Sequence, residues 1–177
     1  DGLSFSGGSL NTGLTSGAFV NGDTFAAVTA NATYGGSSQG TKNAGSHVIS
    51  ASDNGKNALG YGVTYTSGSL TINKADLNVT ASQVTKTYDG TTKASGTVTV
   101  AALAGVAGGD VVNNAGSQAF LDANAGSNKT VRASGVTIKD AANADMTGNY
   151  NIIYNDNTSS VINKANLTVT ANGDARF

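Results

Sequence analysis

The chain repeats one ten-residue sequence about 90 residues apart. Ile72–Ala81 reads INKADLNVTA and Ile162–Ala171 reads INKANLTVTA, so eight of the ten positions are identical. Aromatic and aliphatic residues alternate before each copy, in Tyr61–Tyr65 and in Tyr150–Tyr154. A period of two predicts strands with one apolar face. Repetition of the same order of elements predicts two related β-rich units in tandem.

A second match lies further upstream in each unit. Asn43–Ser46 and Asn124–Ser127 both read NAGS, and each leads into an alternating run. The two units also differ, because Leu70 in the first stands where the second has Ser160. We therefore expect the same strand order in both units with different details of packing.

The buried face of the chain is predicted to change between the units. Leu70 and Ile72 share one face of a strand, whereas Leu77 and Val79 have the opposite parity, so the chain changes core near Lys74. The predicted division is residues 1–74 (a unit without its N-terminal strand), residues 75–164, and residues 165–177 (the first strand of a further unit). The predicted core residues are Tyr61, Val63, Tyr65, Leu70 and Ile72 in the first unit and Tyr150, Ile152, Tyr154 and Ile162 in the second.

The composition restricts the function classes. Val, Ile, Leu and Phe make up about a fifth of the 177 residues, which favours thin sheets over one large core. The formal net charge of −1 lacks the basic footprint of a nucleic-acid binder. The absence of Cys excludes disulfides and thiolate metal sites, and no apolar stretch approaches the roughly 18 residues of a membrane span.

Few residues are candidates for chemistry. His47 is the only histidine and has no identifiable partner, so we expect it to lie on a strand. Asp53–Gly55 and Asn155–Asn157 lack the spacing and the Glu of a calcium loop, and we expect turns there. The sequence thus predicts no catalytic residue, no cofactor and no metal. Possible glycosylation sequons begin at Asn31, Asn78, Asn128, Asn157 and Asn166.

Several short motifs together resemble a known repeat family. Lys86–Thr92 (KTYDGTT), Gly108–Asp110 (GGD), Gly148–Tyr150 (GNY) and Ile162–Ala165 (INKA) resemble the YDG-type repeat of large bacterial exoproteins. The first unit, through segments such as Gly60–Tyr65 (GYGVTY), resembles the related MBG repeat.

The resemblance implies a fold and a setting. It implies two tandem, mostly β, small grasp-like domains arranged end to end. It also implies the repeat region of a filamentous-haemagglutinin-like adhesin, exported by two-partner secretion to the surface of a Gram-negative bacterium, where such proteins serve adhesion, biofilm formation and virulence. A parallel β-helix is the alternative fold, although its coils of about 20 residues fit the observed period poorly.

The expected function is structural. The chain is expected to be a stalk segment that gives an adhesin length and mechanical resistance, with neighbouring repeats of the same chain as its partners. The alternative is a binding module that contacts a host glycan or protein directly. An enzyme is not expected.

The motif Tyr88-Asp89-Gly90 is expected to be a structural turn. The Asp89 carboxylate would accept local backbone N–H groups, and Gly90 would supply a backbone conformation that other residues resist. Tyr88 would cover one end of the core.

Overall fold

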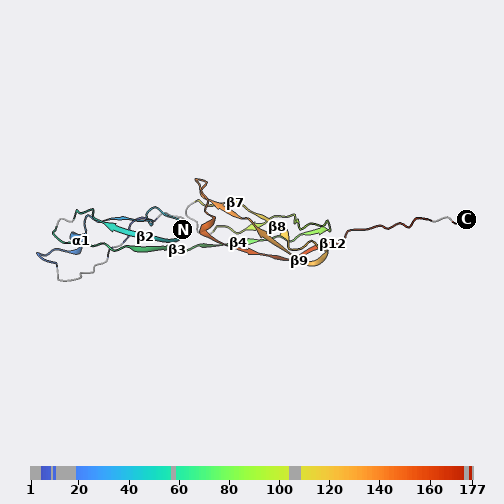
Figure 1. Ribbon diagram of the computed structural model, residues 1–177, viewed down its shortest axis with the longest axis horizontal. Helices are drawn as coiled ribbons and strands as arrows, with labels where there is room; N and C mark the ends of the chain where they lie inside the picture. The colour runs from blue at the N-terminus through green and yellow to red at the C-terminus, as the bar shows by residue number, and fades with distance from the viewer. Residues whose placement is uncertain are drawn as a thin grey trace. The chain divides into compact units, whose positions relative to one another are not determined.

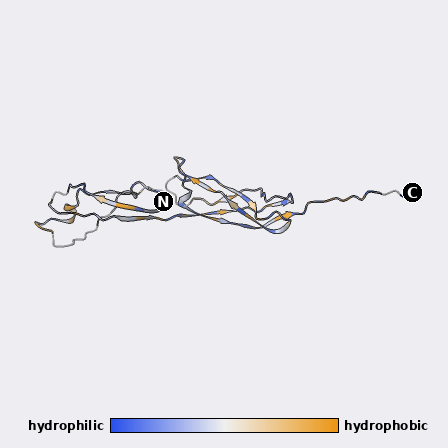
Figure 2. Ribbon diagram, in the orientation of Figure 1, coloured by the Kyte–Doolittle hydropathy of each residue, from blue (hydrophilic) through white to orange (hydrophobic). Residues whose placement is uncertain are grey.

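The computed structural model describes residues 5–8, 10, 19–56, 59–103, 109–173 and 176, and the regular secondary structure of these residues is almost entirely β-strand. Two compact units are present: one holds Asp1–Ala75 with Gly105–Asp110 and Gly148–Tyr150, and the other holds the rest of the chain (Figure 1). Figure 2 shows hydrophobic and hydrophilic stretches mixed along the strands of both units. The expectation of a mostly β chain is therefore confirmed.

In the residues of the first unit that the structure describes, there are one short helix and three strands. These are α1 (Phe25–Val28), β1 (Thr33–Gly35), β2 (Gly45–Ser52) and β3 (Gly68–Ile72). Both strand pairs are antiparallel, in the order β1-β2-β3. Helix α1 begins after Thr24, whose side chain accepts a hydrogen bond from the Ala27 N–H at 3.2 Å.

The core of the first unit is thin. Among its described residues, Val28 and Ser38 are buried. The five side chains predicted to form its core are only half-buried, so the prediction that they are largely buried is wrong. Half-burial follows from a sheet of three short strands, which leaves much of each apolar face without a covering layer.

The second unit, counted from here on along the sequence as residues 75–163, contains nine strands and one 3-10 turn among its described residues, although Ala75 and Gly148–Tyr150 cluster with the first compact unit. In chain order these are β4 (Ala75–Thr80), β5 (Thr85–Thr87), β6 (Thr99–Val100), β7 (Val111–Asn114), β8 (Ser117–Phe120), β9 (Gly126–Ser134), β10 (Thr137–Lys139), η1 (Thr147–Asn149), β11 (Tyr150–Asn155) and β12 (Asn157–Asn163). They form three sheets, ordered β5-β12-β9-β8, β11-β4-β6 and β10-β7.

The strand pairings are mixed. β12 is antiparallel to β9 and parallel to β5, and β8 is antiparallel to β9. A parallel β-helix contains parallel pairs throughout, so the antiparallel pairs of the described residues exclude that alternative. The β9–β12 register is interrupted on both sides of Ser160, where the ladder is irregular.

Apolar side chains from β4, β9 and β12 form the core of the second unit. Leu77 and Val79 of β4 are 1% and 0% exposed, while Val131 of β9 and Ile162 of β12 are 0% and 1% exposed. Tyr150 is also buried, as predicted, whereas Ile152 and Tyr154 are half-buried.

The two units share a three-strand pattern. The NAGS sequences lead into β2 and β9, and the equivalent residues Ile72 and Ile162 lie in β3 and β12. Each equivalent pair is antiparallel, β2 with β3 and β9 with β12. A third strand lies on the other side in each case, β1 beside β2 and β8 beside β9. The sequence repeat therefore corresponds to a structural repeat.

Candidate functional site

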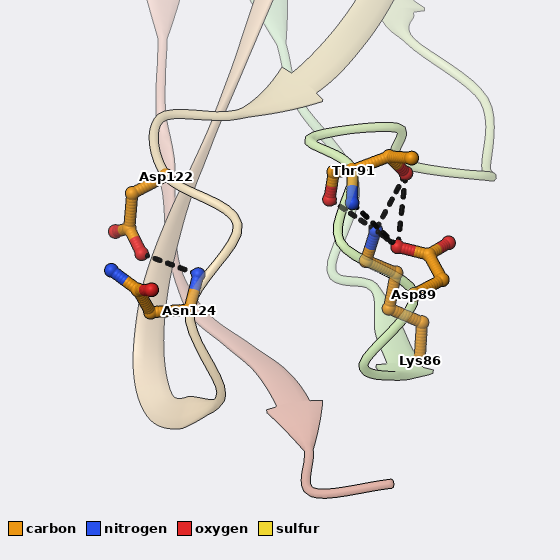
Figure 3. Close-up of polar contacts among 5 residues, drawn as sticks. All are labelled: Lys86, Asp89, Thr91, Asp122 and Asn124. Carbon is orange, nitrogen blue, oxygen red and sulfur yellow. Dashed lines mark hydrogen bonds and ion pairs between the residues drawn. The ribbon is translucent and has the colours of Figure 1, made fainter.

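The Tyr-Asp-Gly motif forms a closed turn directly after β5. Asp89 Oδ1 accepts hydrogen bonds from Lys86 Nζ at 2.8 Å and from the Thr91 N–H and hydroxyl at 2.9 Å each (Figure 3). Lys86 Nζ also donates to the Thr91 carbonyl oxygen at 2.6 Å. Gly90 has φ of 74°, in the left-handed region that disfavours a side chain. The turn thus fixes the path of the chain where it leaves β5.

The charges of this turn perturb the Asp89 carboxyl group. The hydrogen bond from Lys86 is the largest cause, followed by the two from Thr91, and together they lower the pKa of Asp89 to about 2. The ionised form of Asp89 is therefore the one that the turn stabilises. Because the group is exposed to solvent, this describes local order more than global stability.

Tyr88 does not cover the core, contrary to expectation. Its side chain is 46% exposed. The backbone N–H of Tyr88 still donates to the Asn163 carbonyl oxygen at 2.8 Å, but the chain turns away at this point. Phe120 fills the end of the core and is 2% exposed, with the Lys86 ammonium 5.4 Å from the centre of its ring. Lys86, and not Tyr88, therefore lies beside the buried Phe120 ring.

The first and last segments of the second unit run side by side in the same direction. In the register of β5 with β12, Thr85 lies opposite Val161 and Thr87 lies opposite Asn163. Upstream, β4 is the hydrogen-bonded neighbour of β11. Three further backbone hydrogen bonds join the two segments: Ala81 N–H to Asn155 O (3.0 Å), Val161 N–H to Val84 O (2.9 Å) and Tyr88 N–H to Asn163 O (2.8 Å).

This parallel arrangement determines how a pulling force along the chain would act on the second unit. The two segments are parallel, so the chain enters the pair at one end and leaves it at the other end. Tension applied through the chain therefore acts along the strands and must shear the hydrogen bonds between them. We call this pair, residues 75–88 with residues 150–163, the terminal-strand clamp.

Two buried polar side chains fasten the clamp. Ser160, 0% exposed, accepts from the Val84 N–H at 2.9 Å, and its hydroxyl donates to Asn157 Oδ1 at 2.8 Å. Gln118 of β8 accepts from the Ser82 N–H at 2.8 Å and donates to Ser82 Oγ at 2.9 Å. Both hold the connection between β4 and β5, whose backbone groups would otherwise be buried without partners.

The sequence predicts no role for Gln118, and Ser160 is expected from it only as a position that lacks an apolar side chain. In the sequence, Ser160 and Gln118 can be noticed only as polar residues at core-facing positions of alternating strands. Such a residue identifies a buried hydrogen bond only when the strand that faces it is known.

Two of the family-like motifs meet in one hydrogen bond. The Tyr150 hydroxyl, from GNY, donates to Asp110 Oδ2, from GGD, at 2.9 Å. The pKa of Tyr150 is raised to about 12. Burial is the largest cause, and the Asp110 carboxylate is the second. Tyr150 is 7% exposed, so its hydroxyl needs this partner.

Two exposed ion pairs involve basic residues of β9. Arg132 binds Asp156 through two nitrogens, with the shortest contact 2.6 Å, and Lys129 pairs with Asp122. Asp122 also accepts from the Asn124 N–H at 2.9 Å, which closes the loop before β9 (Figure 3). The hydrogen bond from Arg132 lowers the pKa of Asp156, and that from Lys129 lowers the pKa of Asp122.

The other candidate residues lie in separate places. His47 lies half-buried on β2, with Nε2 2.8 Å from the Asn43 carbonyl oxygen. Asp53 accepts from the Gly55 N–H at 2.9 Å, in a turn. Within the described part of the chain, no group of three or more His, Cys, Asp or Glu side chains is placed to hold a metal ion. No helix among the described residues is long and apolar enough to cross a membrane.

The sequon asparagines differ in their surroundings. Asn157 is half-buried, and its Oδ1 accepts from Ser160, so its side chain has a structural role. The side chain of Asn31 donates to the Lys56 carbonyl oxygen at 2.8 Å, and Asn78 Oδ1 accepts from Asn155 at 3.3 Å. Asn128 and Asn166 are exposed.

Comparison with known proteins bears on the second unit. Residues 73–160 match the YDG domain family. This match begins at the entry to the terminal-strand clamp and includes the Tyr-Asp-Gly turn and both motifs joined by Tyr150 and Asp110. No curated protein and no solved structure matches the chain.

Proposed function

We propose that this chain is a load-bearing stalk segment of an extended bacterial cell-surface adhesin. In this role it gives the adhesin length and resistance to pulling, and it carries a binding region away from the cell. The observation that carries the proposal is the terminal-strand clamp, because a stalk under tension is pulled through the two ends of each unit.

The clamp suits a load along the chain. Force enters the second unit through β4 and leaves through β12, and the hydrogen bonds between these segments lie across the direction of pulling. They must break together, whereas hydrogen bonds in a hairpin pulled from its open end break one at a time. Ser160 and Gln118 add buried side-chain bonds to the connection between β4 and β5. Simultaneous rupture raises the force at which the unit opens.

The wider setting is also part of the proposal. The match of residues 73–160 to the YDG domain supports a repeat region of an exported surface protein, of the two-partner secretion type in a Gram-negative bacterium. The parallel pairing of β5 with β12 supports a grasp-like arrangement for the second unit, repeated end to end. Neighbouring repeats would then be its partners, and the host surface would be met by another part of the protein.

Single-molecule pulling tests the load-bearing role. A tandem array of this chain, pulled through its termini, should give repeated unfolding peaks. A unit of about 90 residues should lengthen by roughly 300 Å, since each residue extends by about 3.3–3.6 Å. The same unit attached through β8 and β9 should open at lower force, because that antiparallel pair would separate one bond at a time.

A pair of variants separates mechanical from thermodynamic effects. Val161→Pro removes the N–H that binds Val84 inside the clamp. Ile138→Ala removes a buried side chain from β10, which belongs to another sheet. We expect Val161→Pro to lower the unfolding force more than Ile138→Ala at comparable loss of stability. Equal effects on force would contradict a clamp.

A binding screen tests the alternative role. The intact chain applied to a glycan array and to host matrix proteins should give no specific signal under the stalk proposal. Specific micromolar binding that one surface substitution abolishes would favour a binding module instead.

A further inference from the structure

We propose that Asn21 is a site of spontaneous deamidation by water, and that Asn54, in a turn of the same design, is protected from it. Three observations carry this inference. Both asparagines precede a glycine in matching turns, the reacting backbone N–H is capped in only one of these turns, and further contacts of the first unit depend on the uncapped turn. The site belongs to the first unit and is independent of the mechanical role proposed for the second.

One Asn-Gly pair lies in the turn of residues 20–23. Asn21 and Gly22 have φ of 55° and 78°, both in the left-handed region. The Asp23 N–H donates to the Val20 carbonyl oxygen at 3.0 Å and closes the turn. This pattern matches a type I′ turn, which Asn-Gly favours. Both central residues are exposed.

A second Asn-Gly pair lies in the turn of residues 53–56, which follows β2. Asn54 and Gly55 have φ of 52° and 74° and are also exposed. The Lys56 N–H donates to the Asp53 carbonyl oxygen at 3.0 Å. At the glycine of either turn, no heavy atom beyond its chain neighbours lies within 4 Å of the place that a Cβ would take. The two turns therefore have similar backbone conformations, and neither is crowded.

Deamidation at an Asn-Gly pair is an attack of the backbone on the side chain. The glycine nitrogen forms a bond to the asparagine Cγ, the bond from Cγ to Nδ2 breaks, and the proton of the glycine N–H is transferred to the leaving nitrogen, which departs as ammonia. Water then opens the resulting cyclic imide at either carbonyl carbon and gives aspartate or isoaspartate. Glycine hinders this attack least because it has no side chain. The availability of its nitrogen therefore controls the first step.

The glycine nitrogen is capped in only one of the two turns. The Gly55 N–H donates to Asp53 Oδ1 at 2.9 Å. The corresponding residue of the other turn is Val20, whose side chain offers no acceptor, and among the described residues no acceptor binds the Gly22 N–H. A carboxylate beside the N–H also opposes the loss of its proton, because like charges repel. We expect the capped asparagine to react about fivefold more slowly, the factor that corresponds to one hydrogen bond of about 1 kcal/mol.

The uncapped turn holds a contact of the first unit. The Tyr61 hydroxyl accepts from the Val20 N–H at 2.9 Å and donates to Asp23 Oδ2 at 3.1 Å. The Tyr61 ring meets Phe19 edge to face, with the ring centres 5.8 Å apart. Isoaspartate at position 21 would lengthen the main chain between Val20 and Asp23 by one carbon atom, so these two residues would no longer bind one hydroxyl in this geometry. Deamidation of Asn21 is therefore expected to release Tyr61 from the turn.

Peptide mapping of the intact chain tests the site. Trypsin cleaves after Lys42, Lys56 and Lys164, among other residues, which places the three Asn-Gly pairs of the sequence in separate peptides. During incubation in warm, mildly alkaline buffer, the peptide that contains Asn21 should gain the mass of the acid form about fivefold faster than the peptide that contains Asn54. Equal rates, or faster conversion of Asn54, would overturn the proposal.

A reciprocal pair of variants tests the cap. Val20→Asp gives the Gly22 N–H an acceptor of the same kind, and Val20 is 58% exposed, so the first unit should tolerate the change. This variant should slow the reaction at Asn21, whereas Asp53→Val should speed the reaction at Asn54. The matched control is Val20→Glu, which adds the same charge on a side chain too long for the Asx turn and should slow Asn21 less. Equal slowing by the two acidic variants would assign the protection to charge alone and overturn the cap.

The same measurement in urea separates structure from sequence. Unfolding removes the contact between Asp53 and Gly55, so the rates at Asn21 and Asn54 should become nearly equal. A ratio that stays the same in the unfolded chain would show that the sequence alone sets the rates, and it would overturn the structural inference.

Hydrogen exchange tests the expected loss of the Tyr61 contact. The deamidated chain gains a negative charge and is separated from the intact chain by anion exchange. The Val20 N–H should exchange faster in the isoaspartate form than in the intact chain. Asn21→Asp, which adds the charge without lengthening the main chain, should keep the slower exchange. Unchanged exchange of the Val20 N–H in the isoaspartate form would overturn the release of Tyr61.

Discussion

The hydroxyl of Ser160 accepts a hydrogen bond from the backbone N–H of Val84, 2.9 Å away, and so joins β12, the last strand of the second unit, to the connection between β4 and β5. Ser160 is fully buried, and its hydroxyl donates in turn to Asn157 Oδ1. A leucine occupies the equivalent position of the first unit. Compared with the leucine of the first unit, Ser160 therefore loses an apolar contact but gains a hydrogen bond to the backbone of Val84.

Ser160→Ala is expected to destabilise the second unit by about 1–3 kcal/mol, the cost of leaving a buried N–H without an acceptor. Urea unfolding followed by circular dichroism measures the change. The exposed neighbour Ser159 provides the control, because Ser159→Ala should have a much smaller effect. An unchanged unfolding midpoint for Ser160→Ala would mean that another group satisfies the Val84 N–H.

Asp89 should make the stability of the turn depend on acid pH. Its folded pKa of about 2 lies below the ordinary 3.8, so its contribution is present above pH 3.8 and is lost as the pH falls towards 2. Asp89→Asn should melt at lower temperature than the wild type above pH 3.8, and the two melting curves should converge near pH 2. Melting temperatures measured across this range provide the test.

Lys86→Met gives a second test of the same linkage. Lys86 is the largest cause of the lowered pKa, so its removal should move the acid-sensitive range upward. A range that stays in place would show that Thr91 alone holds the carboxylate.

The sequence predicted the repeated strands because period-two alternation is a local signal. Leu77 and Val79 were assigned to one face of a strand, and both are buried in β4. The repeat of INKA and NAGS motifs also predicted the same strand order in both units, and the structure adds that β2 pairs with β3 as β9 pairs with β12.

Details that depend on neighbouring strands could not be predicted in the same way. Alternation shows which side of Val63 and Tyr65 is apolar, but burial also requires a covering strand. Tyr88 has the apolar character of a core residue, yet the turn that Asp89 and Gly90 impose carries it outward. The bond between Ser160 and Val84 joins residues 76 positions apart, which no local pattern encodes.

Leu77 and Leu167 form a natural matched pair for a stability measurement. Both occupy the same place in the repeated motif, but Leu77 is 1% exposed and Leu167 is 87% exposed. Leu77→Ala should cost about 2–5 kcal/mol, as expected for a buried leucine. Leu167→Ala should change the free energy of unfolding of the monomer by no more than about 0.5 kcal/mol. Urea titration of both variants and the wild type, followed by circular dichroism, provides the comparison.

Tyr150 should be among the last of the six tyrosines to ionise. Burial and the Asp110 carboxylate raise its pKa to about 12 from the ordinary 10.0, so the folded state keeps it neutral. Its contribution to stability is therefore full below pH 10.0 and is lost as the pH rises towards 12. Tyrosinate absorbance during alkaline titration should contain a late step that Tyr150→Phe diminishes. Part of the step remains, because burial and Asp53 also raise the pKa of Tyr65. Asp110→Asn should shift that step to lower pH without restoring the ordinary value, because burial, the larger cause, remains. A late step of undiminished size in Tyr150→Phe would contradict the Tyr150–Asp110 pair as its cause.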